Sequence, residues 1–278
     1  MSPQFVDFNG DGHTDIVTAT FDGSPWVSLG SKEGFAQPAH IKDKEGKRII
    51  LSYYWDYDAR KWTDYEEGGI TGSKAHCISA VAFDWNGDGA LDLLLGDRNG
   101  GLWLQLNEGS SKEPKFSGAS TPVMIGDKPL NAGGKMTAPV LVDWDKDGLT
   151  DLVVGTFQAS KPGATGGVEG GGVKWFRNAG KKGAPAFEEA KVLIPGVSRA
   201  KLESEPARPD QGLYVSVTDY NGDGKLDLIV GGYSTWKAEA TEEKKAATNM
   251  RKPFVWVYMR KTEPRSEAKT APADEERS

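Results

Sequence analysis

A nine-residue acidic pattern occurs four times in this chain, and each copy leads directly into an apolar run. The clearest copy runs from Asp143 to Asp151, with carboxylates at positions 1, 3, 5 and 9 and glycine at position 6. The other copies span residues 7–15, 84–92 and 219–227 and have asparagine at position 3. Ca²⁺ prefers six to eight hard oxygen ligands. The spacing therefore predicts one Ca²⁺ site in each loop, up to four in the chain.

The expected ligands are the side-chain oxygens of positions 1, 3, 5 and 9 and the backbone carbonyl of position 7, where the side chain is free to vary. These residues are Asp7, Asn9, Asp11, His13 and Asp15; Asp84, Asn86, Asp88, Ala90 and Asp92; Asp143, Asp145, Asp147, Leu149 and Asp151; and Asp219, Asn221, Asp223, Lys225 and Asp227. The third loop alone has a fourth aspartate. Its charge predicts the most acidic site, and the one most disturbed by metal removal.

An EF-hand loop opens in the same way, but it needs a bidentate glutamate at position 12 and a helix on either side. Position 12 of the four loops is Thr18, Leu95, Val154 and Val230, and the flanking residues are typical of strands. Both observations exclude an EF-hand. Mg²⁺ fits less well, because it demands a strict octahedron and retains its waters. Ordinary turns do not require a carboxylate at position 9 in all four copies.

The residues around the loops repeat as well. An apolar strand precedes each loop, a second follows it, and a third comes after a turn, as at Leu102–Leu106 and Val173–Arg177. In the first unit, a fourth strand is expected to begin at Phe35. Stacked radially, such antiparallel units form a β-propeller. The sequence therefore predicts an all-β chain with four clear four-stranded blades and room for a fifth.

We expect one propeller domain over residues 1–261 and a disordered, charged tail over residues 262–278. Insertions are expected near residues 42–73, 158–172 and 236–252. The first could hide a degenerate blade. The last is rich in Ala, Glu and Lys and is typical of an exposed helix or a disordered segment.

The loops, the strand before each and the Asp-Leu-hydrophobic-hydrophobic-Gly run after most of them resemble FG-GAP/VCBS repeats, the integrin-α-like propeller repeats. The resemblance covers most of residues 4–260. It implies Ca²⁺ in each loop, a propeller fold and an extracellular, periplasmic or cell-surface location. Propellers of this family usually have seven blades, whereas four units are clear here.

The composition and charge of the chain limit the classes of partner that it can bind. The net charge is −6, but 13 aspartates lie in the loops, and four bound Ca²⁺ ions would bring the charge to about +2. The sequence shows no dense basic patch for nucleic acid and no apolar run of membrane-spanning length. No signal peptide is evident, since Met1 leads straight into the first repeat. Cys77 is expected to be a buried apolar residue and not a catalytic thiol with His76.

Three functions stay open at this stage. The favoured one is a Ca²⁺-stabilised binding or adhesion module for a protein or glycan. The second is a propeller enzyme, a polysaccharide lyase or hydrolase, with Tyr53, Asp56, Arg98 and Tyr233 as candidate residues. The third is a structural domain of a surface assembly. The aromatic cluster over residues 53–65 could stack carbohydrate, although a hairpin packing its own rings is favoured. His13, His40 and His76 show no metal-ligand spacing.

Overall fold

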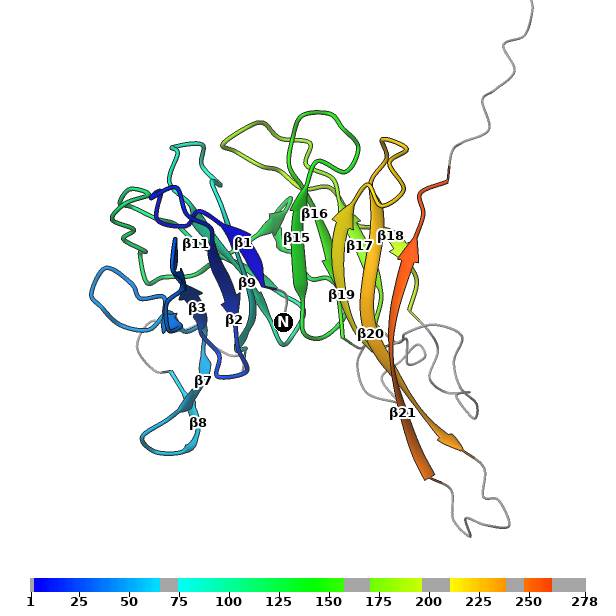
Figure 1. Ribbon diagram of the computed structural model, residues 1–278, viewed down its shortest axis with the longest axis horizontal. Coiled ribbons are helices and arrows are strands. Elements are labelled where there is room, and N and C mark those ends of the chain that lie inside the picture. The colour runs from blue at the N-terminus through cyan, green and yellow to red at the C-terminus, as the bar shows by residue number, and fades with distance from the viewer. Residues whose placement is uncertain (1–2, 66–74, 158–170, 197–210, 239–247, 262–278) are drawn as a thin grey trace, which may run out of the picture.

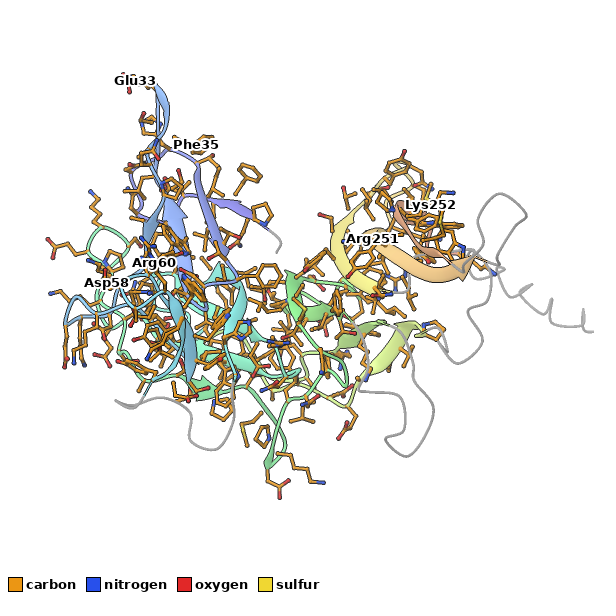
Figure 2. All side chains as sticks on the ribbon, turned by 90° about the horizontal axis from the view of Figure 1, so that it is seen from below. Glu33, Phe35, Asp58, Arg60, Arg251 and Lys252 are labelled. Atoms are coloured by element: carbon orange, nitrogen blue, oxygen red, sulfur yellow. The ribbon has the colours of Figure 1, made fainter. Side chains whose placement is uncertain are left out.

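The computed structural model describes residues 3–65, 75–157, 171–196, 211–238 and 248–261, and over these ranges the chain is all-β, with no helix. Four antiparallel sheets follow one another around a common axis, as Figures 1 and 2 show from two directions. The fold is a four-bladed β-propeller, as the sequence predicts. No described segment is a helix long and apolar enough to cross a membrane.

Each blade begins with its innermost strand. Blade 1 contains β1 (Gln4–Val6), β2 (Asp15–Ala19), β3 (Pro25–Ser28) and β6 (Ala39–His40). Blade 2 contains β9 (Cys77–Phe83), β10 (Asp92–Asp97), β11 (Leu102–Gln105) and β12 (Thr121–Pro122). Blade 3 contains β15 (Ala138–Val142), β16 (Asp151–Gly155), β17 (Val173–Phe176) and β18 (Lys191–Ile194). Blade 4 contains β19 (Gln211–Thr218), β20 (Asp227–Ala238) and β21 (Thr248–Tyr258).

The blades stack face to face, and the strands after the acidic loops are buried on both sides. Leu93 and Leu95 of β10 pack in the core between blades 1 and 2, whereas Leu94 packs between blades 2 and 3. Val153 of β16 faces blade 4 in the same way. Successive strand residues point to opposite faces, so a strand sandwiched between two blades must be apolar at every position. This explains the continuous apolar runs in the sequence.

Three core clusters join the four blades in series, and among the described residues no comparable cluster joins blade 4 to blade 1. A cavity of about 650 Å³ is lined by all four innermost strands and extends along blade 4 to Ile229 and Val255. Phe5 of β1 is 64% exposed and Val255 of β21 is 75% exposed. The central channel therefore opens sideways onto one face of blade 4.

The fourth strand of blade 1 differs from the prediction. Phe35 belongs to a small hairpin of β4 (Gly30–Ser31) and β5 (Gly34–Phe35), and β6 pairs with β3 instead. Gly34 has a φ of +118°, a conformation in which glycine avoids the strain of a side chain. The tight turn reverses the chain before it can join the blade.

Over its described residues 42–65, the insertion near residues 42–73 does not supply a fifth blade. Its described part forms one hairpin, β7 (Tyr53–Asp56) and β8 (Lys61–Asp64), which projects from blade 1 (Figure 1). Another small hairpin, β13 (Met124–Ile125) and β14 (Lys128–Pro129), follows blade 2. Residues 66–73 of the insertion lie outside the described residues.

The segment near residues 236–252 is not a helix where the structure describes it. Trp236 pairs with Met250, and the β20–β21 ladder continues without a break from Leu228 to Ala238. The Arg251 guanidinium carbon lies 3.9 Å from the centre of the Tyr233 ring. Cross-strand pairing and ring contacts therefore prevail over the helix propensity of Ala, Glu and Lys. Residues 239–247, the glycine-rich residues 158–170 and the tail lie outside the described residues.

Candidate metal centres

All four acidic loops lie at the same end of the propeller, because each joins the first strand of a blade to the second. At position 1, the carboxylate accepts backbone N–H groups from positions 5 and 6. In the third loop, Asp143 accepts from Asp147 at 3.0 Å and from Gly148 at 2.9 Å. The corresponding distances in the other loops are 2.8–3.1 Å. Glycine at position 6 has a φ of +80° to +90°, so a side chain there would strain the turn.

Positions 3 and 5 are joined by an amide in three of the loops. The Asn9 Nδ2 group donates to Asp11, and Asn86 and Asn221 donate in the same way to the aspartates two residues on. The position 5 carboxylate also accepts the N–H of position 7, as Asp11 does from His13 at 2.8 Å. Hydrogen bonds from His13 and Asn9 lower the pKa of Asp11, which stays ionised at neutral pH.

The aspartate at position 9 is buried, and its carboxylate also accepts hydrogen bonds from two backbone N–H groups. Asp92 is 1% exposed, and the other three position 9 aspartates are fully buried. One Asp92 oxygen accepts the N–H of Trp85 at 2.9 Å, and the other accepts the N–H of Asn107 at 2.7 Å. The same pair of bonds recurs in every loop. Burial raises the pKa of Asp92 and of Asp151.

The second of these bonds comes from the residue two positions after the last residue of the blade's third strand. The donors are Gly30, Asn107, Asn178 and Arg260. A carboxylate oxygen that accepts an N–H still has a lone pair, so the bond does not prevent metal ligation. Position 9 thus fastens the loop to the third strand, and the sequence pattern did not indicate this role.

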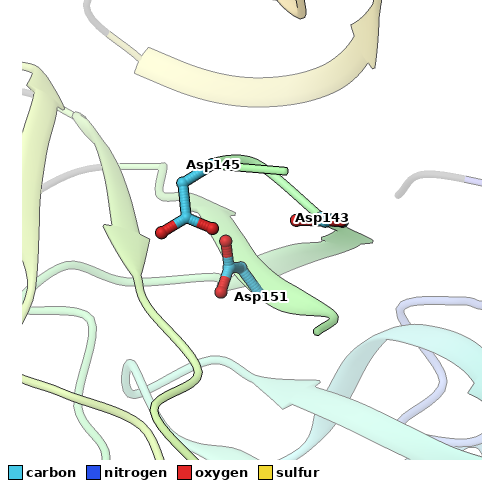
Figure 3. Close-up of side chains that lie close together, drawn as sticks. All are labelled: Asp143, Asp145 and Asp151. Atoms are coloured by element: carbon cyan, nitrogen blue, oxygen red, sulfur yellow. The ribbon is translucent and has the colours of Figure 1, made fainter. Parts of the chain in front are cut away.

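The third loop gathers a carboxylate cluster. Asp143, Asp145 and Asp151 each offer an oxygen within 4.8 Å of the others, and Figure 3 shows Asp145 and Asp151 with their carboxylates turned toward each other. The Asp145 Oδ1 atom is buried without a hydrogen-bond partner. An orphaned, buried, ionisable oxygen beside two other carboxylates fits an oxygen-preferring cation. The residues present therefore fit Ca²⁺.

Two features of the loops escaped the sequence reasoning. Position 4 has a positive φ in every loop, and it is glycine in three of them and Lys146 in the third. The Asn-Gly pairs in the sequence were the available signal. The other feature is Arg177, at the end of the third strand of blade 3. Its Nε donates to Asp145 at 2.6 Å, and its Nη2 bonds to Asp147. The hydrogen bond with Asp145 raises the pKa of Arg177.

A buried carboxylate also stands at the opposite end of blade 1. Asp22, 6% exposed, accepts from Thr20 at 2.6 Å and Arg48 at 3.2 Å and contacts His40 Nε2 at 2.9 Å. Burial alone would raise the pKa of Asp22, but hydrogen bonds from Thr20 and His40 hold it below its usual value. The Tyr57 hydroxyl donates at 3.3 Å, so the cluster ties the 42–64 insertion to the blade.

Blade 2 contains a similar aspartate, which shows that the role of Asp22 in closing the turn is structural. Asp97 occupies the corresponding turn and accepts the N–H groups of Asn99 and Gly101 and the Trp103 indole at 2.8 Å. The Trp26 indole donates to Asp22 in the same manner. An aspartate that closes the turn and holds the tryptophan of the third strand thus recurs without any histidine or tyrosine.

Cys77 and the aromatic cluster over residues 53–65 behave as the sequence indicates. Cys77 is fully buried, and burial raises the pKa of its thiol. His76 is 2% exposed, and its Nδ1 has no partner. The Tyr53 ring stacks on Trp62 with centroids 5.0 Å apart, and Trp62 also contacts Trp55 and His76. The β7–β8 hairpin therefore packs its own aromatic rings.

A cavity of about 610 Å³ lies at the end of the propeller opposite the acidic loops. Its apolar lining is mainly aromatic and combines the β2–β3 turn of blade 1 with blades 3 and 4. The lining includes Phe21, Phe157, Tyr214, Tyr233, Arg251 and Pro253. Of the four candidate catalytic residues, Tyr233 lies here, whereas Tyr53, Asp56 and Arg98 do not line this cavity.

Fold and loops together define a β-propeller with one acidic loop in each blade. The FG-GAP-like repeat matches residues 7–95 and 84–154, and the FG-GAP repeat matches residues 215–235. The first match alone covers more than half of the chain, and the chain belongs to the FG-GAP repeat family. A comparison with curated proteins finds no match.

Proposed function

We propose that this chain is an extracellular, calcium-stabilised β-propeller that binds a protein or glycan partner. Four loops of the same build present carboxylate and amide oxygens at one end, and the orphaned Asp145 Oδ1 fits a bound Ca²⁺ ion. Extracellular calcium modules bind at about 10⁻⁴–10⁻³ M, which matches loops as exposed as these. The ions would offset the repulsion among the carboxylates of each loop.

The aromatic cavity at the opposite end supports a binding role. It offers the rings of Phe157, Tyr214 and Tyr233, with the Arg251 guanidinium beside them. Concave sites with aromatic walls and few polar groups are typical of ligand binding. Arg251 can contact a carboxylate or a hydroxyl group of a partner while the rings stack on its apolar surface.

A glycan and protein screen at millimolar calcium tests this proposal, with Tyr233→Ala and Arg251→Ala as site variants. Lys252→Ala is the matched control, because Lys252 adjoins Arg251 in β21 (Figure 2) and is not among the residues that line the cavity. Both site variants are expected to weaken binding at least about tenfold, since interface tyrosines and arginines often contribute 1.4 kcal/mol or more. Equal binding by all three variants would exclude this cavity as the binding site for the partner.

A second role, as a structural domain of a surface assembly, is favoured by blade 4. Among the described residues, the outer edge of β21 has no strand paired to it, and Val255 and Trp256 are exposed. Unpaired sheet edges are templates for another strand. Light scattering of the chain at increasing concentration distinguishes the roles. Self-association that Val255→Lys abolishes would favour assembly, and a monomer throughout would favour the binding module.

We do not extend the proposal to polysaccharide cleavage. Tyr53 and Arg98 lie near His76, whereas Tyr233 lines the aromatic cavity with Arg251. A lyase or hydrolase needs an acid and a base that converge on one substrate bond. The Asp22 cluster follows the turn-closing plan of Asp97 and is committed to holding the insertion.

A further inference from the structure

The third loop differs from the other three at position 4, where Lys146 replaces glycine, and at two further places that contact each other. Position 3 is Asp145 instead of asparagine, and Arg177 contacts both Asp145 and Asp147. Arg177 directly precedes Asn178, the residue that donates to the position 9 aspartate. The residues that precede the matching donors in blades 1, 2 and 4 are Leu29, Leu106 and Met259.

All three of these equivalents are apolar and exposed, at 37–46% of their surface. The position is thus accessible to solvent in every blade, and in each it directly precedes the donor to the position 9 aspartate. It carries a cation only in the blade whose loop has the extra carboxylate. The guanidinium places a positive charge beside a loop with four carboxylates, whereas each of the other loops has three carboxylates.

Arg177 also replaces a hydrogen bond. In the other loops, the asparagine Nδ2 joins position 3 to position 5, as Asn86 does to Asp88 at 2.8 Å. Asp145 has a carboxylate in place of the amide and offers no N–H donor to Asp147. The Arg177 guanidinium donates to both carboxylates and restores the link. Asp145 and Arg177 therefore do together what asparagine does alone.

We propose that Arg177 is a built-in cation of the third loop that holds positions 3 and 5 together without metal and competes with Ca²⁺ for the negative charge of their carboxylates. This inference rests on the proposed calcium binding. It makes the third loop the one least dependent on calcium and the weakest of the four sites. The fourth aspartate alone predicted the opposite order. A bound Ca²⁺ ion that uses Asp145 must share it with a guanidinium or displace the guanidinium.

The test compares three variants of the whole chain. Arg177→Leu gives blade 3 the residue found in blades 1 and 2. The double variant Asp145→Asn with Arg177→Leu also gives it their position 3 residue, with Lys146 left unchanged at position 4. In blade 2, Asn86→Asp with Leu106→Arg installs the pair elsewhere and is the reciprocal control. Calorimetric calcium titration gives the affinities, and the heat lost in Asp143→Ala identifies the third site.

Arg177→Leu is expected to tighten calcium binding at the third site by about tenfold or more, because a full positive charge beside the ion is removed. In chelator, the same variant should melt about 2–4 °C lower, since two carboxylates lose their bridge. The double variant should recover most of that loss. The blade 2 control should show weaker calcium binding at the second site.

Two results would overturn the inference. One is binding at the third site that is unchanged or weaker in Arg177→Leu, because the guanidinium would then not compete with the ion. The other is an unchanged melting temperature of that variant in chelator. Calcium binding at the other loops with no response to Arg177→Leu contradicts this inference alone. No calcium binding at any loop contradicts the proposed function as well.

Discussion

The carboxylate of Asp92 accepts the backbone N–H of Asn107 at 2.7 Å and so joins the end of a loop to the end of the third strand of its blade. Asn107 is itself buried, and its side-chain oxygen accepts the N–H groups of Gly109 and Lys115. Asn178 repeats both contacts in blade 3. The position 9 carboxylate is thus hydrogen-bonded both to its own loop and to the residue that holds the turn after the third strand.

Asp92→Ala should therefore destabilise the protein even without metal. The substitution leaves the N–H groups of Trp85 and Asn107 without acceptors, and unsatisfied buried donors cost about 1–3 kcal/mol each. Asp88→Ala, at the exposed position 5, should have little effect in chelator and should lower stability only in calcium. Denaturant unfolding in both solutions checks this. Equal losses for the two variants in chelator would contradict the role given to position 9.

Calcium should stabilise the fold and magnesium should do so much less. An ion that binds only the folded chain adds about 2–3 kcal/mol per site at a hundredfold excess over Kd. Melting curves in chelator, in calcium and in an equal concentration of magnesium measure the effect. A melting temperature that is the same in calcium and in chelator would show that the loops act as ordinary turns.

His76 should make the protein less stable in mild acid. Burial lowers the pKa of His76 to about 4, below the value of about 6.5 expected in an unfolded chain. Between these two values the unfolded chain binds more protons, so stability present above about pH 6.5 is lost as the pH falls toward 4. The loss should be on the order of 3 kcal/mol, since one pKa unit corresponds to about 1.4 kcal/mol. Unfolding of His76→Gln from pH 7 to pH 4 should show a shallower fall, and an equal slope would assign the effect to other groups.

The Cys77 thiol should be inert in the folded protein. It is fully buried and its pKa is raised, so neither reagent nor base reaches it easily. A thiol reagent at pH 8 should react only when denaturant is present, and the labelling rate should follow the unfolding equilibrium. Cys77→Ser should be destabilised, because a hydroxyl would replace the sulfur in the core between blades 1 and 2. Rapid native labelling would show that this core opens locally.

The parts of the fold that depend on residues close together in the chain could be predicted from the sequence. The acidic loops, the apolar strands beside them and the Asn-x-Gly turns are local patterns with fixed spacing. The short outer strands are not, since β6 and β12 have two residues each and are defined only by their partners. The extension of β20 and β21 was missed because cross-strand contacts such as Arg251 on Tyr233 are invisible to helix propensity.

In the candidate sites, the spacing of the acidic residues located the loops, but it did not predict which distant residues contact them. Arg177 is far from Asp145 in sequence, and only the antiparallel pairing of β16 with β17 brings it over the loop. The open side of blade 4 depends in the same way on where whole sheets come to lie.

The acidic loops and the aromatic cavity stand at opposite ends of the same strands. Substitutions that reshape the cavity leave the loops untouched, and changes in the loops do not alter the residues at the far end. Related propellers can therefore change the partner that they bind while the acidic loops that stabilise the fold stay the same. Variation between relatives should then concentrate at the cavity end of the blades.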